Sequence, residues 1–117
     1  MVYLDTDEIV SLEMYTYFRE REFKKSLSYL ARTFSDQLER GEDYLLAKKV
    51  ISINLMEENY HLNNFQILNN YGFVNKFNYG RMKDEYLEMY LIRLDLVKEM
   101  VYNKIESRFE KWLRQGV

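Results

Sequence analysis

Hydrophobic and polar positions alternate with a period of two near the start of the chain, between residues 9 and 17. Alternate side chains of a β-strand share a face, so this segment predicts a strand with one polar and one apolar face. The polar set is Ser11, Glu13, Tyr15 and Tyr17, and the apolar set is Val10, Leu12, Met14 and Phe18. We expect the apolar set to face a core. Residues 2–4 predict a second short strand, joined to the first through the turn-like residues 5–8.

The period changes to three and four between residues 20 and 40, which predicts a long amphipathic helix. Its apolar positions are Phe23, Leu27, Leu30, Ala31, Phe34 and Leu38. Gly41 follows as the expected left-handed C-terminal cap. The opposite side carries a mainly basic stripe of Lys24, Lys25, Ser28, Arg32 and Asp36. Such a stripe is more often solvated helix surface than a track for phosphate groups.

The middle of the chain predicts further strands over residues 49–68. The run Val50 to Met56 is short and rich in β-branched residues, as expected of a central strand covered on at least one face. Residues 61–68 can add another extended piece. The sequence Asn69-Asn70-Tyr71-Gly72 predicts a turn.

The C-terminal region allows two interpretations. Residues 86–94 alternate like a strand, followed by a helix over residues 96–114, and we favour this reading. The alternative is one continuous helix from Asp84, because an apolar stripe also fits the whole region. Its members are Leu87, Leu91, Leu94, Val97, Val101, Ile105, Phe109 and Trp112.

The composition fits one domain over residues 1–117, of the α/β (α+β) class. With 47% hydrophobic residues the chain can bury enough surface to fold. It has no cysteine, which excludes disulfides and thiolate metal sites, and no signal peptide or membrane-length apolar run is recognisable. We therefore expect a cytoplasmic protein with no membrane partner. A formal net charge of −2 limits any DNA binding to a local basic patch.

Glu13 and Tyr15 are the first candidates for chemistry. They lie two residues apart on one face of the predicted strand, just before the helix with the basic stripe, which is the order of parts in a metal-dependent nuclease. A carboxylate on a packed strand costs desolvation unless it meets a cation or hydrogen-bond donors. The alternative is a solvated glutamate on an edge strand. His61, the only histidine, lacks the second ligand that a transition-metal site needs.

Several segments together carry a resemblance to a known family. These are Leu12-Glu13-Met14, then Ser35 to Tyr44 with Gln37 and Gly41 inside it, then Lys48-Lys49-Val50-Ile51-Ser52-Ile53-Asn54, and a late Lys111-Trp112 pair. In this order they resemble the PD-(D/E)XK nuclease family transposases, the recombination-promoting nuclease group of bacteria. The resemblance implies part of a restriction-endonuclease-like core and magnesium-dependent cleavage of DNA.

The resemblance also implies roles for individual residues. Glu13 would bind Mg²⁺ through its carboxylate and Met14 through its backbone carbonyl, with no other small-molecule cofactor. Tyr15 would take the catalytic position where the family carries glutamine and its relatives carry lysine. DNA phosphates would be met by Lys25, Arg32, Gln37 and Lys48, and Tyr44 also occupies a family-typical position. Gln37 and Tyr44 can equally anchor the helix end to the following loop.

Two departures from the family pattern weaken the case for catalysis. A tyrosine with its ordinary pKa near 10 is a poor base at neutral pH. The family's second metal-binding residue, an aspartate, lies more than a dozen residues before the glutamate, so we expect it to be missing and the chain to be a C-terminal part of such a nuclease. Asp5 and Asp7 are its possible substitutes. We therefore predict weak or absent nuclease activity and a homo-oligomer, with a non-catalytic oligomerisation or interaction module as the alternative function.

Overall fold

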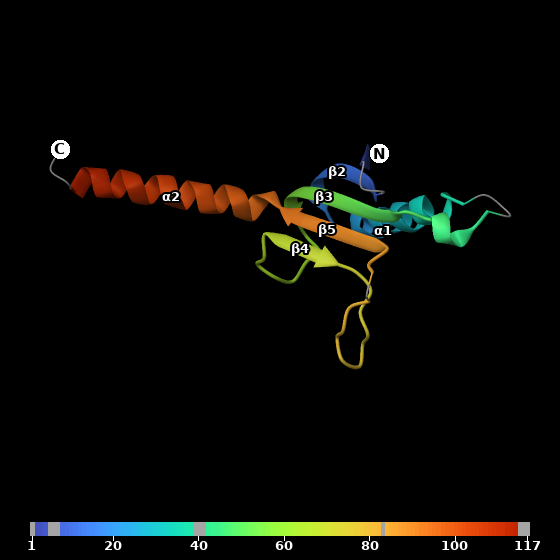
Figure 1. Cartoon of the computed structure of the whole chain (residues 1–117). Coiled ribbons are helices and arrows are strands. Elements are labelled where there is room, and N and C mark those ends of the chain that lie inside the picture. The colour runs from blue at the N-terminus through green and yellow to red at the C-terminus, as the bar shows by residue number, and fades with distance from the viewer. Residues whose placement is uncertain (1, 5–7, 39–41, 83, 115–117) are drawn as a thin grey trace.

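The computed structural model of the chain describes residues 2–4, 8–38, 42–82 and 84–114. These described residues form five strands, two α-helices and one short 3₁₀ helix, and Figure 1 shows their arrangement. In order they are β1 (Val2–Leu4), β2 (Glu8–Phe18), α1 (Glu20–Ser35), η1 (Tyr44–Leu46), β3 (Lys49–Asn59), β4 (Leu68–Tyr71), β5 (Leu87–Arg93) and α2 (Leu94–Arg114). The mixed α/β class expected from the sequence is confirmed, and the arrangement is consistent with a restriction-endonuclease-like α+β fold.

One mixed sheet organises the molecule, with the strand order β1-β2-β3-β5-β4. The three inner strands β2, β3 and β5 run parallel, and the outer strands β1 and β4 pair with them antiparallel. Helix α1 connects β2 to β3, as a crossover between parallel strands requires. The register places Glu13 of β2 directly beside Asn54 of β3.

The core lies on the face of the sheet that α1 covers, and this corrects the expectation for β2. Ile9 is buried, and Tyr15 packs against the core, so the polar set of β2 shares its face with the core. Leu12 and Met14 are 62% and 60% exposed on the other face. The expected inward direction is therefore wrong for Leu12 and Met14, whereas Phe18 is fully buried at the strand end. The reason is that α1 returns over the face that carries Glu13.

Helix α1 is shorter than the sequence indicated, because it ends at Ser35 and not near Arg40. Its start is stabilised by Glu22, whose carboxylate accepts hydrogen bonds from the backbone amide and the side chain of the N-cap residue Arg19. Leu27, which we expected in the core, is 49% exposed. The predicted cap at Gly41 lies outside the described residues.

The segment after β3 also differs from expectation. Residues 60–67 form no strand, and residues 69–71, which predicted a turn, belong to β4. Asn69 explains the difference. Its buried side-chain amide donates hydrogen bonds to the carbonyl oxygens of Gln66 and Leu91, which hold β4 against β5 at the edge of the sheet. An asparagine with buried partners is compatible with a strand despite its turn propensity.

The C-terminal region confirms the favoured reading, a strand followed by a helix. Strand β5 spans Leu87–Arg93 and α2 follows without a break, so the continuous helix from Asp84 is wrong. Helix α2 extends away from the sheet, which gives the chain principal extents of 74 × 33 × 30 Å (Figure 1). None of the described helices combines the length and apolarity needed to cross a membrane.

Candidate functional site

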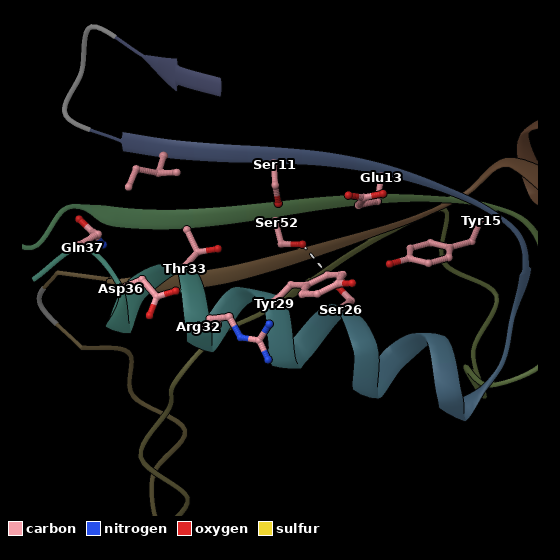
Figure 2. A pocket seen from close by; sticks show the side chains of 11 residues that line it. Ser11, Glu13, Tyr15, Ser26, Tyr29, Arg32, Thr33, Asp36, Gln37 and Ser52 are labelled. Atoms are coloured by element: carbon pink, nitrogen blue, oxygen red, sulfur yellow. Dashed lines mark hydrogen bonds between the residues drawn. The ribbon is translucent and has the colours of Figure 1, made fainter. Parts of the chain in front are cut away.

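A cleft of about 450 Å³ lies between β2 and α1, on the face of the sheet that carries Glu13 (Figure 2). Strand β2 and its neighbour β3 form one wall, and the second half of α1 forms the other. The lining residues are Ile9, Ser11, Glu13, Tyr15, Ser26, Tyr29, Arg32, Thr33, Asp36, Gln37 and Ser52. The structure therefore brings together four of the residues selected from the sequence, namely Glu13, Tyr15, Arg32 and Gln37.

Tyr15 is the most constrained side chain of the cleft. Its ring packs edge-on against Phe18 with ring centroids 5.4 Å apart, and its hydroxyl oxygen is buried without a hydrogen-bond partner among the described residues. Burial raises the pKa of the Tyr15 phenol above its ordinary value of 10.0, and the nearby Glu13 carboxylate raises this pKa further. The phenol therefore stays protonated at neutral pH and cannot act as a base.

The floor of the cleft is a buried network of polar side chains. Asn54 is fully buried, accepts a hydrogen bond from the Ser26 hydroxyl at 2.9 Å, and donates to the Ser52 hydroxyl at 2.9 Å. Its amide also donates to the backbone carbonyl of Tyr90 on β5, at 3.2 Å. The network joins α1, β3 and β5, so it fixes the helix over the sheet directly beside Glu13.

The cationic side of the cleft comes from α1. Arg32 is exposed at the rim, and its guanidinium makes no hydrogen bond or ion pair with the described part of the chain. Lys25 lies about two helical turns before Arg32 on the same helix, with its ammonium 5.7 Å from the centre of the Tyr29 ring. Lys48 lies just before β3 and is half-buried.

Gln37 has a specific structural contact. Its side-chain amide donates to the backbone carbonyl of Lys48 at 2.7 Å, and its side-chain oxygen accepts from the Lys48 backbone amide. These two bonds tie the end of α1 to the start of β3, although Gln37 also borders the cleft. Tyr44 lies in η1, is 85% exposed and does not line the cleft. The Met14 side chain points to the other face of β2.

The donor set of the cleft does not fit a tight magnesium site. Mg²⁺ prefers an octahedral set of oxygens, with one or two carboxylates positioned by the fold. Over residues 2–4, 8–38, 42–82 and 84–114, no three side chains of the histidine, cysteine, aspartate or glutamate type are grouped to hold a metal. Glu13 and Asp36 are the acidic residues of the lining, and Figure 2 shows them at separate places along the cleft. Asp5 and Asp7 lie outside the described residues.

Sequence reasoning missed the polar floor and Tyr29. A signal for the floor was present, because Ser52 and Asn54 interrupt the apolar alternation of β3, and Ser26 lies between Phe23 and Leu30 on the buried side of α1. Polar residues at positions that the pattern reserves for apolar ones indicate a buried hydrogen-bond network. No sequence signal distinguishes Tyr29 from the other exposed tyrosines.

Comparison with known proteins gives one family and no individual relative. A family model described as PD-(D/E)XK nuclease family transposase matches residues 1–115. Comparison with curated proteins gives no significant match, and comparison with solved structures gives none either.

Proposed function

Because the chain belongs to the PD-(D/E)XK nuclease family transposases, we propose that its cleft binds the backbone of DNA but supports little or no metal-dependent cleavage. The observation that supports this proposal is the composition of the cleft. An exposed arginine at the rim, Arg32, can meet a phosphate, whereas the described residues group no further acidic ligands for a magnesium ion with Glu13.

The DNA side of the proposal rests on the exposed cations of α1. Arg32 can form paired hydrogen bonds to a phosphate, and Lys25 on the same helix adds a second positive charge. With a net charge of −2 for the whole chain, this local arrangement and not bulk charge would attract DNA. Gln37 lines the cleft and is hydrogen-bonded to the backbone of Lys48, so Lys48 lies next to this region, and Tyr44 would contact DNA only outside the cleft.

Weak catalysis follows from the residues beside Glu13. Tyr15 occupies the position of the catalytic lysine or glutamine, and its raised pKa keeps it neutral, so it cannot take a proton from water at neutral pH. Glu13 with the backbone carbonyl of Met14 would supply only part of the shell of a magnesium ion. Any Mg²⁺ would therefore be held mainly by water and bound weakly, and we derive no reaction step through it.

The test combines a binding and a cleavage measurement on one set of variants. Fluorescence anisotropy with a 20-base-pair duplex should show salt-dependent binding, and Arg32→Ala should reduce the slope of log K against log salt by about 1. Plasmid nicking in Mg²⁺ or Mn²⁺ should be absent or very slow. Glu20→Ala removes another exposed carboxylate, which lies on α1 in a surface ion pair with Lys24, and serves as the matched control for Glu13→Ala.

Two results would contradict the proposal, and they contradict different parts of it. Robust nicking that Glu13→Ala abolishes and Glu20→Ala preserves would show a working metal centre. A duplex affinity that is equal in the parent chain and Arg32→Ala at every salt concentration would remove the cleft from DNA binding.

A second candidate function is self-association, and the open surfaces of the sheet favour it. Strand β2 pairs with β3 on one side, and on its other side β1 pairs only with residues 8–10. The remainder of that side of β2 has no neighbouring strand among the described residues. Leu12 and Met14 are also exposed on the face opposite α1. Exposed strand edges and apolar faces are usually covered by another chain. We therefore propose a homo-oligomer, in the cytoplasmic setting expected from the sequence.

A further inference from the structure

Helix α2 has no buried side chain along its whole length, although apolar residues run along it. It spans Leu94–Arg114, which corresponds to roughly 32 Å at 1.5 Å per residue. It leaves the sheet at the end of β5 and extends into open space (Figure 1). An isolated helix of this length is only marginally stable in water, and most helices in proteins are stabilised by packing an apolar face. Residues 94–97 of this helix are half-buried near β3, whereas residues 98–114 are exposed, so most of its apolar side has no packing within the described chain.

The apolar side of α2 has a regular arrangement. Val97, Val101, Ile105, Phe109 and Leu113 recur at intervals of four and form one continuous row, which we call the α2 row. Ile105, Phe109 and Leu113 are 63%, 57% and 53% exposed. Trp112 lies beside the row and stacks on Phe109, with ring centroids 6.0 Å apart. Rows with this spacing are the ridges by which two helices interdigitate.

We propose that the α2 row is the contact surface for a second copy of this chain, with the two α2 helices antiparallel and crossing near Ile105. The row is symmetric about Ile105, because two residues lie on each side of it at equal intervals. An antiparallel partner therefore places Ile105 against its own copy and the Val97 end against the Leu113 end. A two-fold axis at this point closes the assembly as a dimer.

The charges of α2 favour the antiparallel direction. Lys98 and Arg108 lie close to the row, and a parallel partner in register would place each of them beside its own copy. Like charges apposed in this way are destabilising. In the antiparallel arrangement Lys98 lies opposite the stacked rings of Phe109 and Trp112, where a cation is attracted to the aromatic faces. Acidic residues outnumber basic ones in the first half of α2, and the reverse holds in the second half.

The shape of the molecule favours the same direction. Two packed helices have axes about 8–10 Å apart. The body from which α2 emerges extends over the smaller dimensions of 33 × 30 Å, so two bodies at the same end of a helix pair would collide. Figure 1 shows the sheet at one end of α2, so an antiparallel pair would place the two bodies at opposite ends.

The exposed area is sufficient for a dimer of moderate affinity. Tyr102, Phe109 and Trp112 are each more than half exposed. Because an aromatic side chain carries ~150–250 Å² of surface, the six rings of two copies present roughly 700 Å². Together with the aliphatic members of the row, two copies offer on the order of 1,200 Å², the lower end of specific interfaces. The inference rests on the proposed self-association and is independent of the proposed DNA binding.

The first experiment measures mass by sedimentation equilibrium over 1–100 µM, a range of about two decades around micromolar affinity. The parent chain should approach twice the monomer mass of 14.4 kDa. Ile105→Glu should weaken the dimer by a factor of about ten or more, because it places two carboxylates together at the centre of the contact. Asn103→Glu adds the same charge on the opposite side of α2 and should leave the mass unchanged. Circular dichroism verifies that each variant retains its strands.

The second experiment uses the absence of cysteine from the chain, since any introduced cysteine is then unique. Under mild oxidation Ile105→Cys should form a disulfide-linked dimer, because the two Cα atoms approach within the range a disulfide spans. Val97→Cys and Leu113→Cys should each fail to link with themselves but should link when mixed.

Every outcome decides a part of the inference. A monomer at 100 µM overturns both the self-association and the α2 contact. A dimer that Ile105→Glu leaves intact keeps the self-association and overturns the α2 contact. Self-linking by all three cysteine variants keeps the contact and overturns the antiparallel direction. Failure of DNA binding has no bearing on any of these results.

Discussion

Replacing Asn54 with alanine should strongly destabilise the protein, because Asn54 is the centre of the buried network under the cleft. The substitution removes the hydrogen bonds to Ser26, Ser52 and the Tyr90 carbonyl from a position with 0% exposure. The Ser26 hydroxyl and the Tyr90 carbonyl would lose a partner where water has little access. Each buried polar group left unsatisfied is costly.

The magnitude follows from the number of bonds. A hydrogen bond contributes about 1 kcal/mol net, so three of them and the small cavity give a loss of about 3 kcal/mol, within a range of ~2–4 kcal/mol. A domain of this size has a free energy of unfolding of about 5–15 kcal/mol, so the loss is a large fraction of the total. Asn54→Asp keeps the shape but replaces the donor, and burying its charge should cost at least as much at pH 7.

Urea unfolding followed by circular dichroism measures this loss at one fixed protein concentration, since self-association would otherwise shift the transition. With a slope of about 1.5 kcal/mol/M, a loss of 3 kcal/mol lowers the midpoint by about 2 M. Asn63→Ala is the matched control, because Asn63 is exposed and should change the free energy of unfolding by less than about 0.5 kcal/mol.

A double-mutant cycle separates the network from simple loss of volume. Ser26→Ala and Asn54→Ala share a hydrogen bond of 2.9 Å, so their combined effect should be smaller than the sum of the single effects. A loss below about 1 kcal/mol for Asn54→Ala would refute the reasoning that this network fixes α1 over the sheet. Strictly additive effects would show that the two side chains act separately.

Two further predictions concern the anchoring of the start of β3 and the buried carboxylate of Glu88 on β5. Gln37→Ala should lower the free energy of unfolding by about 1–2 kcal/mol, because both of its bonds to Lys48 are lost, and it should leave duplex affinity unchanged if Gln37 only anchors the chain. The hydrogen bond from Glu85 and the ammonium of Lys49, 3.0 Å away, lower the pKa of the Glu88 carboxyl below 4.5. A carboxyl group whose pKa is lower in the folded state stabilises the fold at pH values above its unfolded-state pKa. This stabilisation is lost as the pH falls through the folded-state pKa. The hydrogen bond to Glu88 raises the pKa of Glu85, which opposes this loss. Urea midpoints measured from pH 6 to pH 3 should therefore fall less steeply in Glu88→Gln than in the parent chain, and an unchanged slope would contradict the assignment.

The sequence by itself determined the class of the fold, the main elements and the family. Periods of two and of three to four residues depend on local backbone geometry, so they located β2, α1, β3, β5 and α2 within a few residues. The order of short motifs indicated the family that the match over residues 1–115 confirms. The same patterns could not decide which face of β2 is covered, because that depends on where a distant helix returns.

Only the tertiary structure decided how the candidate site is built. It placed Glu13 and Tyr15 on the covered face, and it united Ser26 of α1 with Asn54 of β3, which are 28 residues apart, in one buried network. It also showed that the apolar row of α2 has no buried member within the described chain. Hydrogen bonds and packing between distant segments depend on three-dimensional position, and local periodicity contains no information about it.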